Sequence, residues 1–168
     1  LKPSSGEPVV NPSKDIVLGC FFMTSVKEGA KGEGKVFEDR NAAVMALQEE
    51  VIDLRAQIKV RIDGEILDTS AGRILFNEVL PEGMKYQNDP MTKSKLKKVM
   101  AEVFVGFGVD ATAELSDEIK ELGFKYATLS GISIGMDDLV IPKDRSNLID
   151  AGEDKVISYD KQYEQGLI

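Results

Sequence analysis

Two short stretches of the sequence carry side chains that could do chemistry. Asp137-Asp138 is a pair of adjacent acids, which could bind a metal ion or transfer protons. Adjacent carboxylates rarely converge on one ion without other ligands, so a helix cap or a turn is the favoured interpretation. Residues 29–36 nearly match a phosphate-binding loop, but Val36 stands where that loop needs a hydroxyl to hold magnesium. We therefore expect residues 29–35 to be a flexible connector, and a nucleotide-binding domain using this loop is the minor alternative.

Two absences limit the possible catalytic chemistry. The sequence has no histidine, which excludes Ser-His-Asp and Cys-His nucleophiles and every histidine-bearing metal site. Cys20 is its one cysteine, so disulfides within the chain and multi-cysteine zinc sites are excluded as well. Cys20 lies among apolar residues, and we expect it to be a small core residue in a reducing compartment.

Composition and charge indicate a globular domain that does not bind nucleic acid by itself. The 168 residues are 42% hydrophobic and 30% charged, and no apolar run approaches the roughly 20 residues that cross a bilayer. The net charge of −8 is opposite to that of an autonomous nucleic-acid binder. The cluster Lys93, Lys95, Lys97 and Lys98 is interpreted as a solvated helix face in preference to a phosphate contact.

The elements that must position these groups are predicted from periodicity and punctuation. Helices are expected from Asn11 or Ser13, one of which caps, to Thr24, and over residues 38–50. Clean alternation over residues 54–62 predicts a half-buried strand, after a short strand at 35–37. Asp63-Gly64 then turns the chain into a returning strand at 65–69, which Gly72-Arg73 breaks before a short apolar segment at 74–80.

The second half of the sequence is predicted to be helical. Thr92 caps a helix that Gly108 closes, a second helix begins near Thr112, and the two form an antiparallel pair. A last helix follows Pro142 and runs to about Gln165. Its apolar stripe is thin, so we expect this helix to project from the body or to pack against a partner. The fold class is α+β, a short antiparallel hairpin packed with several amphipathic helices. All 168 residues are expected to form one domain, with segments 1–53, 54–83 and 92–168.

Several strings in collinear order resemble a segment of the largest (beta-prime) subunit of bacterial DNA-directed RNA polymerase. The segment follows the catalytic barrel, is the third domain of the subunit, and is called its pore or secondary-channel region. The matching strings are Gly6-Glu-Pro8, Pro12-Ser-Lys-Asp-Ile-Val-Leu-Gly19, Gly32-Glu-Gly34, Ile58-Lys-Val-Arg-Ile62, Gly72-Arg-Ile-Leu-Phe-Asn-Glu-Val-Leu-Pro-Glu-Gly83, Leu122-Gly-Phe-Lys-Tyr-Ala-Thr128, Ser130-Gly-Ile-Ser-Ile-Gly-Met-Asp-Asp-Leu-Val-Ile-Pro142, Gln162-Tyr163 and Gly166-Leu-Ile168.

The resemblance implies part of a transcription enzyme, a nucleotidyltransferase, that does not catalyse alone. The aspartate triad for the catalytic magnesium and the zinc ligands of the family lie elsewhere, so no cofactor is expected in this chain. The chain would line the secondary channel beside the active site. It is expected to be a fragment of a longer subunit, which fits the lack of an initiator methionine. A structural protein-interaction module is the alternative.

The resemblance also implies partners and a location. These partners are the rest of the beta-prime subunit, the beta subunit and the other polymerase subunits, together with RNA 3′ ends, nucleoside triphosphates and cleavage-type factors that enter the channel. No membrane partner is expected. The location implied is cytoplasmic, in a DNA-binding complex associated with the nucleoid.

Six positions are the candidate site residues. Ser13, Lys14 and Asp15 are expected near nucleotide or RNA, with Lys14 replacing the family's usual Gln. The structural alternative for Ser13 is that its side chain caps the helix that follows. Possible contacts to nucleic acid or another subunit are Arg73, Leu129 and Ser130. Arg73 is more simply explained by structural hydrogen bonds, and Leu129 replaces the family's usual Arg. No catalytic or metal-binding residue is predicted.

Overall fold

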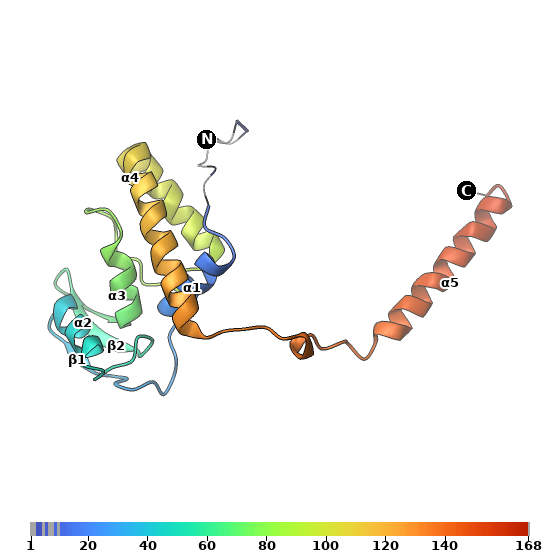
Figure 1. Ribbon diagram of the computed structural model, residues 1–168. Helices are drawn as coiled ribbons and strands as arrows, with labels where there is room; N and C mark the ends of the chain where they lie inside the picture. The colour runs from blue at the N-terminus through green and yellow to red at the C-terminus, as the bar shows by residue number, and fades with distance from the viewer. Residues whose placement is uncertain (1–2, 5, 7–8, 10, 168) are drawn as a thin grey trace. The chain divides into compact units, whose positions relative to one another are not determined.

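Figure 1 shows the computed structural model, which describes residues 3–4, 6, 9 and 11–167. Residues 1–2, 5, 7–8 and 10, and Ile168, lie outside the described residues, which leaves out residues 7–8 of the string Gly6-Glu-Pro8. The chain divides into two compact units, Leu1–Ile132 and Ser133–Ile168. The predicted single domain spans both units, and their boundary falls inside its third segment.

A small mixed sheet lies at one end of the first unit. Its order is β1 (Val36–Phe37), β2 (Ile58–Ile62) and β3 (Glu65–Thr69), with β1 parallel and β3 antiparallel to β2. Asp63 and Gly64 have φ of 51° and 90°, as the predicted two-residue hairpin turn requires. The predicted hairpin is thus confirmed.

The predicted strand 54–62 begins four residues too early. Leu54 and Arg55 use their carbonyls outside the sheet, accepting from Gly72 N at 2.9 Å and Lys27 N at 2.9 Å. Ala56 N donates to Asp53 O at 3.1 Å, which closes a turn. The inward face is nevertheless as predicted, since Ala56 and the alternate residues of β2 are buried.

The segment after the hairpin is a helix and not a broken strand. Helix α3 spans Ala71–Glu78, and Ser70 caps it by accepting from Arg73 N at 3.3 Å. The prediction that Gly72-Arg73 breaks the strand is therefore wrong, because the strand has already ended at Thr69. Gly72 is needed for packing instead: a Cβ there would stand 1.9 Å from the carbonyl oxygen of Met23.

Two helices precede and flank the sheet. Helix α1 spans Asp15–Thr24, and its N-cap position is Lys14, without a side-chain cap hydrogen bond. The predicted caps Asn11 and Ser13 are therefore wrong, because the chain enters the helix one residue later, through a positive φ. Helix α2 spans Arg40–Gln48 inside the predicted 38–50, and Asp39 caps it by accepting from Ala42 N at 2.7 Å.

Helix α4, Lys93–Ser130, is the predicted antiparallel pair. The helical backbone is interrupted at Gly108 (φ 86°, ψ −171°), and Figure 1 shows the two limbs running side by side in opposite directions. Thr92 caps the first limb as predicted, accepting from Lys95 N at 3.4 Å. Thr112 lies inside the second limb, which starts earlier than predicted, and its hydroxyl donates to Gly108 O at 2.7 Å.

Two apolar clusters form the core of the first unit. One fills the space between α1, α3 and both limbs of α4, and Cys20 is fully buried in it as predicted. The other lies between the sheet, α2 and α3, around Ala43, Val60 and Ile74. Together they confirm the α+β fold class, because one cluster joins a small sheet to the helices that cover it and the other is formed mainly by helices.

The second unit contains a 3-10 turn, η1 (Met136–Asp138), and helix α5 (Arg145–Glu164), with no buried side chain among its described residues. Asp138 Oδ2 accepts from Gly135 N at 2.8 Å, which confirms the capping role predicted for the acidic pair. The apolar stripe of α5 is exposed, as at Val156 and Tyr163. In the described part of the chain, no helix is long and apolar enough to cross a membrane.

Candidate functional site

The six predicted site residues lie on or next to three helices, α1, α3 and α4. Ser13, Lys14 and Asp15 lie at the N-terminus of α1. Arg73 lies at the opposite end, where Nε donates to the carbonyl oxygen of Thr24 at 2.9 Å. A helix of ten residues is about 15 Å long. The structure therefore separates Arg73 from the N-terminal group.

Lys14 has the least ordinary backbone of the candidates. Its φ of 48° and ψ of −121° lie in a region that favours glycine, while its carbonyl accepts from Leu18 N at 3.0 Å. The side chains of Ser13, Lys14 and Asp15 are all exposed. An exposed ammonium thus stands at a helix N-terminus, where the helix dipole also favours a negative ligand and Asp15 opposes one.

Close contact between α1 and the second limb of α4 sets the place of Leu129 and Ser130, beyond the middle of α1 and away from Lys14. A Cβ on Gly19 would stand 2.7 Å from Ala127 N, and one on Gly123 would stand 2.7 Å from Ile16 O. Leu129 is two residues beyond Ala127 and its side chain is 65% exposed. The end of α4 is thereby held against α1, and Leu129 presents an uncharged surface there.

Ser130 has a local structural role at the end of α4. Its hydroxyl donates to Ala127 O at 2.7 Å and accepts from Ile132 N at 3.2 Å. Gly131 follows in the left-handed conformation that ends many helices. The hydroxyl of Ser130 is therefore used in ending the helix.

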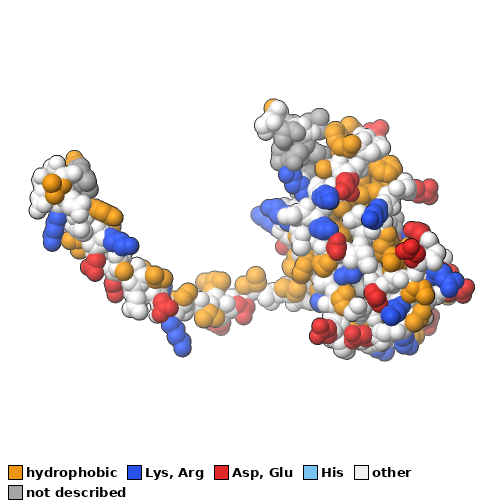
Figure 2. Space-filling view, turned by 180° about the vertical axis from the view of Figure 1, so that it is seen from behind, with side chains coloured by type: hydrophobic (Ala, Val, Ile, Leu, Met, Phe, Trp, Pro, Cys, Tyr) orange, Lys and Arg blue, Asp and Glu red, His pale blue; other side chains and the backbone are white. Residues whose placement is uncertain are grey.

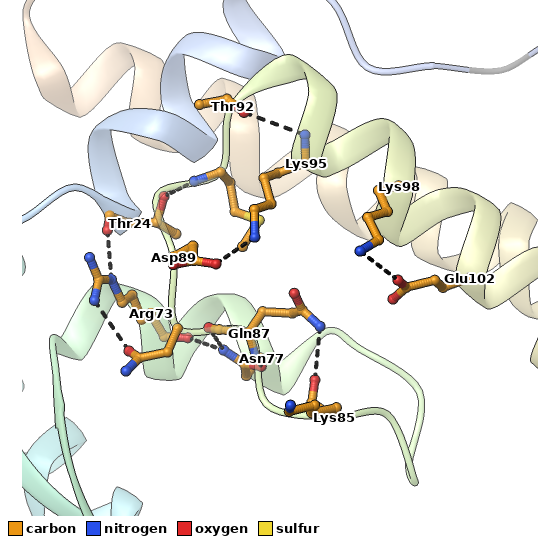
Figure 3. Close-up of polar contacts among 12 residues, drawn as sticks. Thr24, Arg73, Asn77, Lys85, Gln87, Asp89, Thr92, Lys95, Lys98 and Glu102 are labelled. Carbon is orange, nitrogen blue, oxygen red and sulfur yellow. Dashed lines mark hydrogen bonds and ion pairs between the residues drawn. The ribbon is translucent and has the colours of Figure 1, made fainter.

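Arg73 is the centre of a polar network at the C-terminus of α1 (Figure 3). Besides the Thr24 carbonyl, it donates from Nη1 to Asn88 Oδ1 at 3.2 Å. The buried Thr24 hydroxyl in turn accepts from Met91 N at 2.8 Å and donates to Cys20 O at 2.6 Å. Burial lowers the pKa of the Arg73 guanidinium. The geometry matches the structural interpretation of Arg73.

Asn77 is the network member that sequence reasoning missed. Its Oδ1 accepts from Gln87 N at 2.7 Å, and its Nδ2 donates to the carbonyls of Gln87 and Arg73, both at 2.8 Å (Figure 3). These bonds tie the segment after α3 back onto the helix. The available signal was a lone amide inside the apolar run 74–80.

The lysines at the start of α4 form a solvated face, as predicted. Lys95 is paired with Asp89, and Lys98 lies 3.7 Å from Glu102 (Figure 3). The hydrogen bond from Lys95 and its positive charge lower the pKa of Asp89. Lys95 and Lys98 are thus engaged with carboxylates of this chain.

The phosphate-loop candidate, residues 29–35, is occupied by its own contacts. The N–H of Gly29 donates to Glu33 Oε2 at 2.7 Å, and that of Gly34 donates to Gln57 O at 2.8 Å. Lys31 N donates to Asp53 Oδ2 at 3.4 Å. A phosphate cradle needs such backbone N–H groups to point at the ligand. Their use within the protein argues against the nucleotide-binding alternative.

The described residues contain no candidate metal cluster, and the cavity with the largest volume given below lies among other residues. Among the described residues, no group of three or more Cys, Asp or Glu side chains could hold a metal ion. A cavity of about 540 Å³ lies between Arg40, Glu78 and Tyr86. It touches none of the six predicted residues, of which the exposed ones lie at the N-terminus of α1 and the C-terminus of α4.

The whole chain is similar to one kind of protein. Residues 1–139 match the family described as RNA polymerase Rpb1, domain 3. The chain belongs to that family. The protein named DNA-directed RNA polymerase subunit beta' from Dehalococcoides mccartyi is 46% identical over 167 residues, 99% of this chain and 13% of that protein. The proteins of the same name from Moorella thermoacetica and a Sulfurihydrogenibium species are 44% and 43% identical over all of this chain, which spans 15% and 11% of them.

Membership in the Rpb1 domain 3 family confirms the resemblance seen in the sequence. It covers both elements of the candidate site, since α1 and α4 lie within the matched residues. Because the chain spans about an eighth of these relatives, what the whole relatives do is not shown for this domain 3 chain by itself.

Proposed function

We propose that this chain is part of the catalytic core of a bacterial DNA-directed RNA polymerase, where it lines the secondary channel beside the active site. The observation that carries the proposal is identity of 43–46% to beta-prime subunits over essentially the whole chain. In this proposal the chain contributes surface and support and does not catalyse alone. The magnesium and zinc of the complete subunit are held by other segments.

The channel surface in this proposal is formed by the two elements that meet at Gly19 and Gly123. The backbones of the two helices are in contact at that point, so α1 cannot slide along α4 without a steric clash. In this proposal α1 and α4 therefore form one rigid wall. Ser13, Lys14 and Asp15 face outward from one end of α1, and Leu129 from the end of α4. Both groups therefore have a common support and exposed side chains.

Lys14 is the side chain with a direct role in this proposal. Its ammonium can meet a phosphate of a nucleoside triphosphate or of RNA as a point charge. Leu129 adds no charge, so anion binding on this wall depends on Lys14 more than it would with a second cation there. The partners of the proposal are the remaining beta-prime chain, the beta subunit, RNA 3′ ends and cleavage-type factors, in the cytoplasm.

The test uses assembled polymerase in which Lys14→Ala is compared with Lys59→Ala, an exposed lysine on the sheet face. Loss of one exposed charge contact is worth about 0.5–1 kcal/mol, so KM for nucleoside triphosphates is expected to rise about two- to fivefold for Lys14→Ala alone. Leu129→Arg is expected to lower KM. If KM and the rate of RNA 3′ cleavage were unchanged in both Lys14→Ala and Leu129→Arg, that result would contradict the channel role.

A separate measurement tests whether the chain acts only as a part. The isolated chain, with magnesium, template and nucleotides, is expected to synthesise no RNA. Robust synthesis by the isolated chain would overturn the proposal as a whole, whereas the KM comparison tests the channel position alone.

A further inference from the structure

The C-terminal end of α1 is held by groups from other elements, in a contact here called the α1 clamp (Thr24, Arg73 and Met91). The sequence of α1 contains no lysine or arginine that could bind the carbonyls left free in its last turn. Arg73 of α3 supplies a cation from outside, donating from Nε to Thr24 O at 2.9 Å (Figure 3). The N–H of Met91, just before α4, donates to the Thr24 hydroxyl at 2.8 Å. Two other elements therefore fix this end of α1.

Thr24 is too deeply buried to touch a ligand itself. Its side chain and that of Met91 are both 0% exposed. Besides accepting from Met91 N, the Thr24 hydroxyl donates to Cys20 O at 2.6 Å, so it is used as donor and as acceptor. Without the hydroxyl, the buried Met91 N–H would lose its acceptor, and the end of the helix would have to shift to recover one. Thr24 can therefore affect a ligand only through the placement of α1.

The middle of α1 touches the second limb of α4. A Cβ on Gly19 would stand 1.8 Å from the carbonyl oxygen of Gly123, so the two backbones meet there. Gly19 is five residues from Lys14 and five from Thr24, about 7.5 Å along the helix in each direction. A tilt of α1 about this contact would move its two ends by similar distances in opposite directions. The clamp at Thr24 therefore also limits the movement of Lys14.

The Lys14 end of α1 has no hydrogen bond to another element among the described residues. The carbonyls of Ser13 and Lys14 accept from Ile16 N at 3.2 Å and Leu18 N at 3.0 Å, which are local bonds of the first turn. The side chains of Ser13, Lys14 and Asp15 are exposed. The place of Lys14 thus depends on the Gly19 contact and on the clamp at the far end of the helix.

We propose that Thr24 is a positioning residue, whose buried hydroxyl sets where the Lys14 ammonium stands, about 15 Å away along α1. This inference rests on the proposed function, in which that ammonium meets a phosphate. A charge-assisted hydrogen bond needs about 2.7–2.9 Å between its heavy atoms, so a shift of about 1 Å weakens it. Figure 2 shows Lys and Arg side chains interspersed with Asp and Glu on the visible face of the compact body. Charges on such a mixed surface act mainly at short range, so the position of the ammonium matters.

The test compares Thr24→Val with Thr69→Val in assembled polymerase. Thr69 is a matched control: it is also 0% exposed and its hydroxyl bonds that of Tyr86 at 2.9 Å, but it lies on β3. Both changes keep the side-chain shape and remove a buried hydroxyl. KM for nucleoside triphosphates is expected to rise about two- to fivefold in Thr24→Val, as in Lys14→Ala, with kcat unchanged. Thr69→Val should leave KM unchanged.

Two further variants distinguish positioning from a general loss of stability. Thr24→Ser keeps the hydroxyl and is expected to restore the KM of the unmodified enzyme. Adding Lys14→Ala to Thr24→Val is expected to raise KM no further, because both changes remove the same contact. Arg73→Lys weakens the clamp from outside α1 and should raise KM in the same direction, so the test does not depend on assembly of Thr24→Val.

The outcomes separate this inference from the proposed function. If Lys14→Ala raises KM while Thr24→Val and Arg73→Lys do not, the positioning role is overturned and the channel role stands. An equal rise of KM in Thr69→Val, or full additivity of Thr24→Val with Lys14→Ala, would overturn the positioning role as well. If Lys14→Ala itself leaves KM unchanged, the proposed function is contradicted and this inference falls with it.

Discussion

Gly19 of α1 and Gly123 of α4 are in direct backbone contact: a Cβ on Gly19 would stand 1.8 Å from the carbonyl oxygen of Gly123. Side chains separate most packed helices, at interaxial distances of 8–10 Å. Here the small residues let the backbones meet, and the contact fixes the second limb of α4 against the middle of α1.

Gly19→Ala is expected to destabilise the chain strongly. The added methyl group overlaps backbone atoms that cannot move aside, and overpacking of a core typically costs about 1–3 kcal/mol or more. Gly106→Ala is the matched control, because Gly106 has open space and a helical backbone that prefers Ala by about 0.5–1 kcal/mol. Urea unfolding followed by circular dichroism measures both, and equal midpoints for the two variants would show that the close contact is absent.

Arg73→Lys is expected to destabilise the chain by about 1–3 kcal/mol, because an ammonium cannot reproduce both hydrogen bonds to Thr24 and Asn88. The control is Arg61→Lys on the exposed face of β2, which should change the free energy of unfolding by less than about 0.5 kcal/mol. The same urea experiment applies. If Arg73→Lys proved neutral for stability but weakened nucleic-acid binding by the assembled polymerase, the contact role would replace the structural one.

Lys14→Gly is expected to stabilise the isolated chain by up to about 1 kcal/mol, since glycine adopts φ of 48° and ψ of −121° without the strain of a side chain. Ser13→Gly, one residue earlier, lacks this compensation and should be neutral or destabilising. In assembled polymerase, the channel proposal predicts a raised KM for Lys14→Gly despite the gain in stability. A loss of stability in Lys14→Gly would mean that the ammonium itself supports the fold.

Cys20 makes stability depend on pH above the neutral range. Burial raises the pKa of the thiol from 9.0 to about 12, so the folded state keeps its proton where the unfolded thiol ionises. This contribution to stability is complete below pH 9 and decreases towards pH 12, by about 1.4 kcal/mol per pH unit. Unfolding by urea at several pH values measures the slope.

Cys20→Ala is the reference for that slope. Burial also raises the pKa of Tyr86 and Tyr126, which adds a decrease of the same sign in both proteins. The slope above pH 9 should be steeper with Cys20 than with Ala, and iodoacetamide should label Cys20 in urea but not in the folded chain. Identical slopes would show that the thiol reaches solvent in the folded state.

Local patterns in the sequence were sufficient to predict most of the elements. The alternation of β2, the Asp63-Gly64 turn, the Thr92 cap and the glycine that interrupts α4 each act within a few residues, so they are readable without the fold. The family strings pointed to the right family for a similar reason, since they preserve residue order. The start of α1 was misplaced, because Lys14 takes a backbone conformation that nothing in its own side chain favours.

Only tertiary structure decided the roles of Gly72, Arg73 and Asn77. Their partners are Met23, Thr24, Asn88 and Gln87, which lie on other elements, and no sequence spacing relates them. Gly72, interpreted as a strand breaker, is a contact point with α1, and Arg73, a candidate for nucleic-acid contact, donates to the last carbonyl of α1. The sequence alone determined most of the elements, though not α3, and the family to which they belong. Packing determined which side chains are used within the fold and which are left exposed for a partner, because that depends on which backbones approach one another.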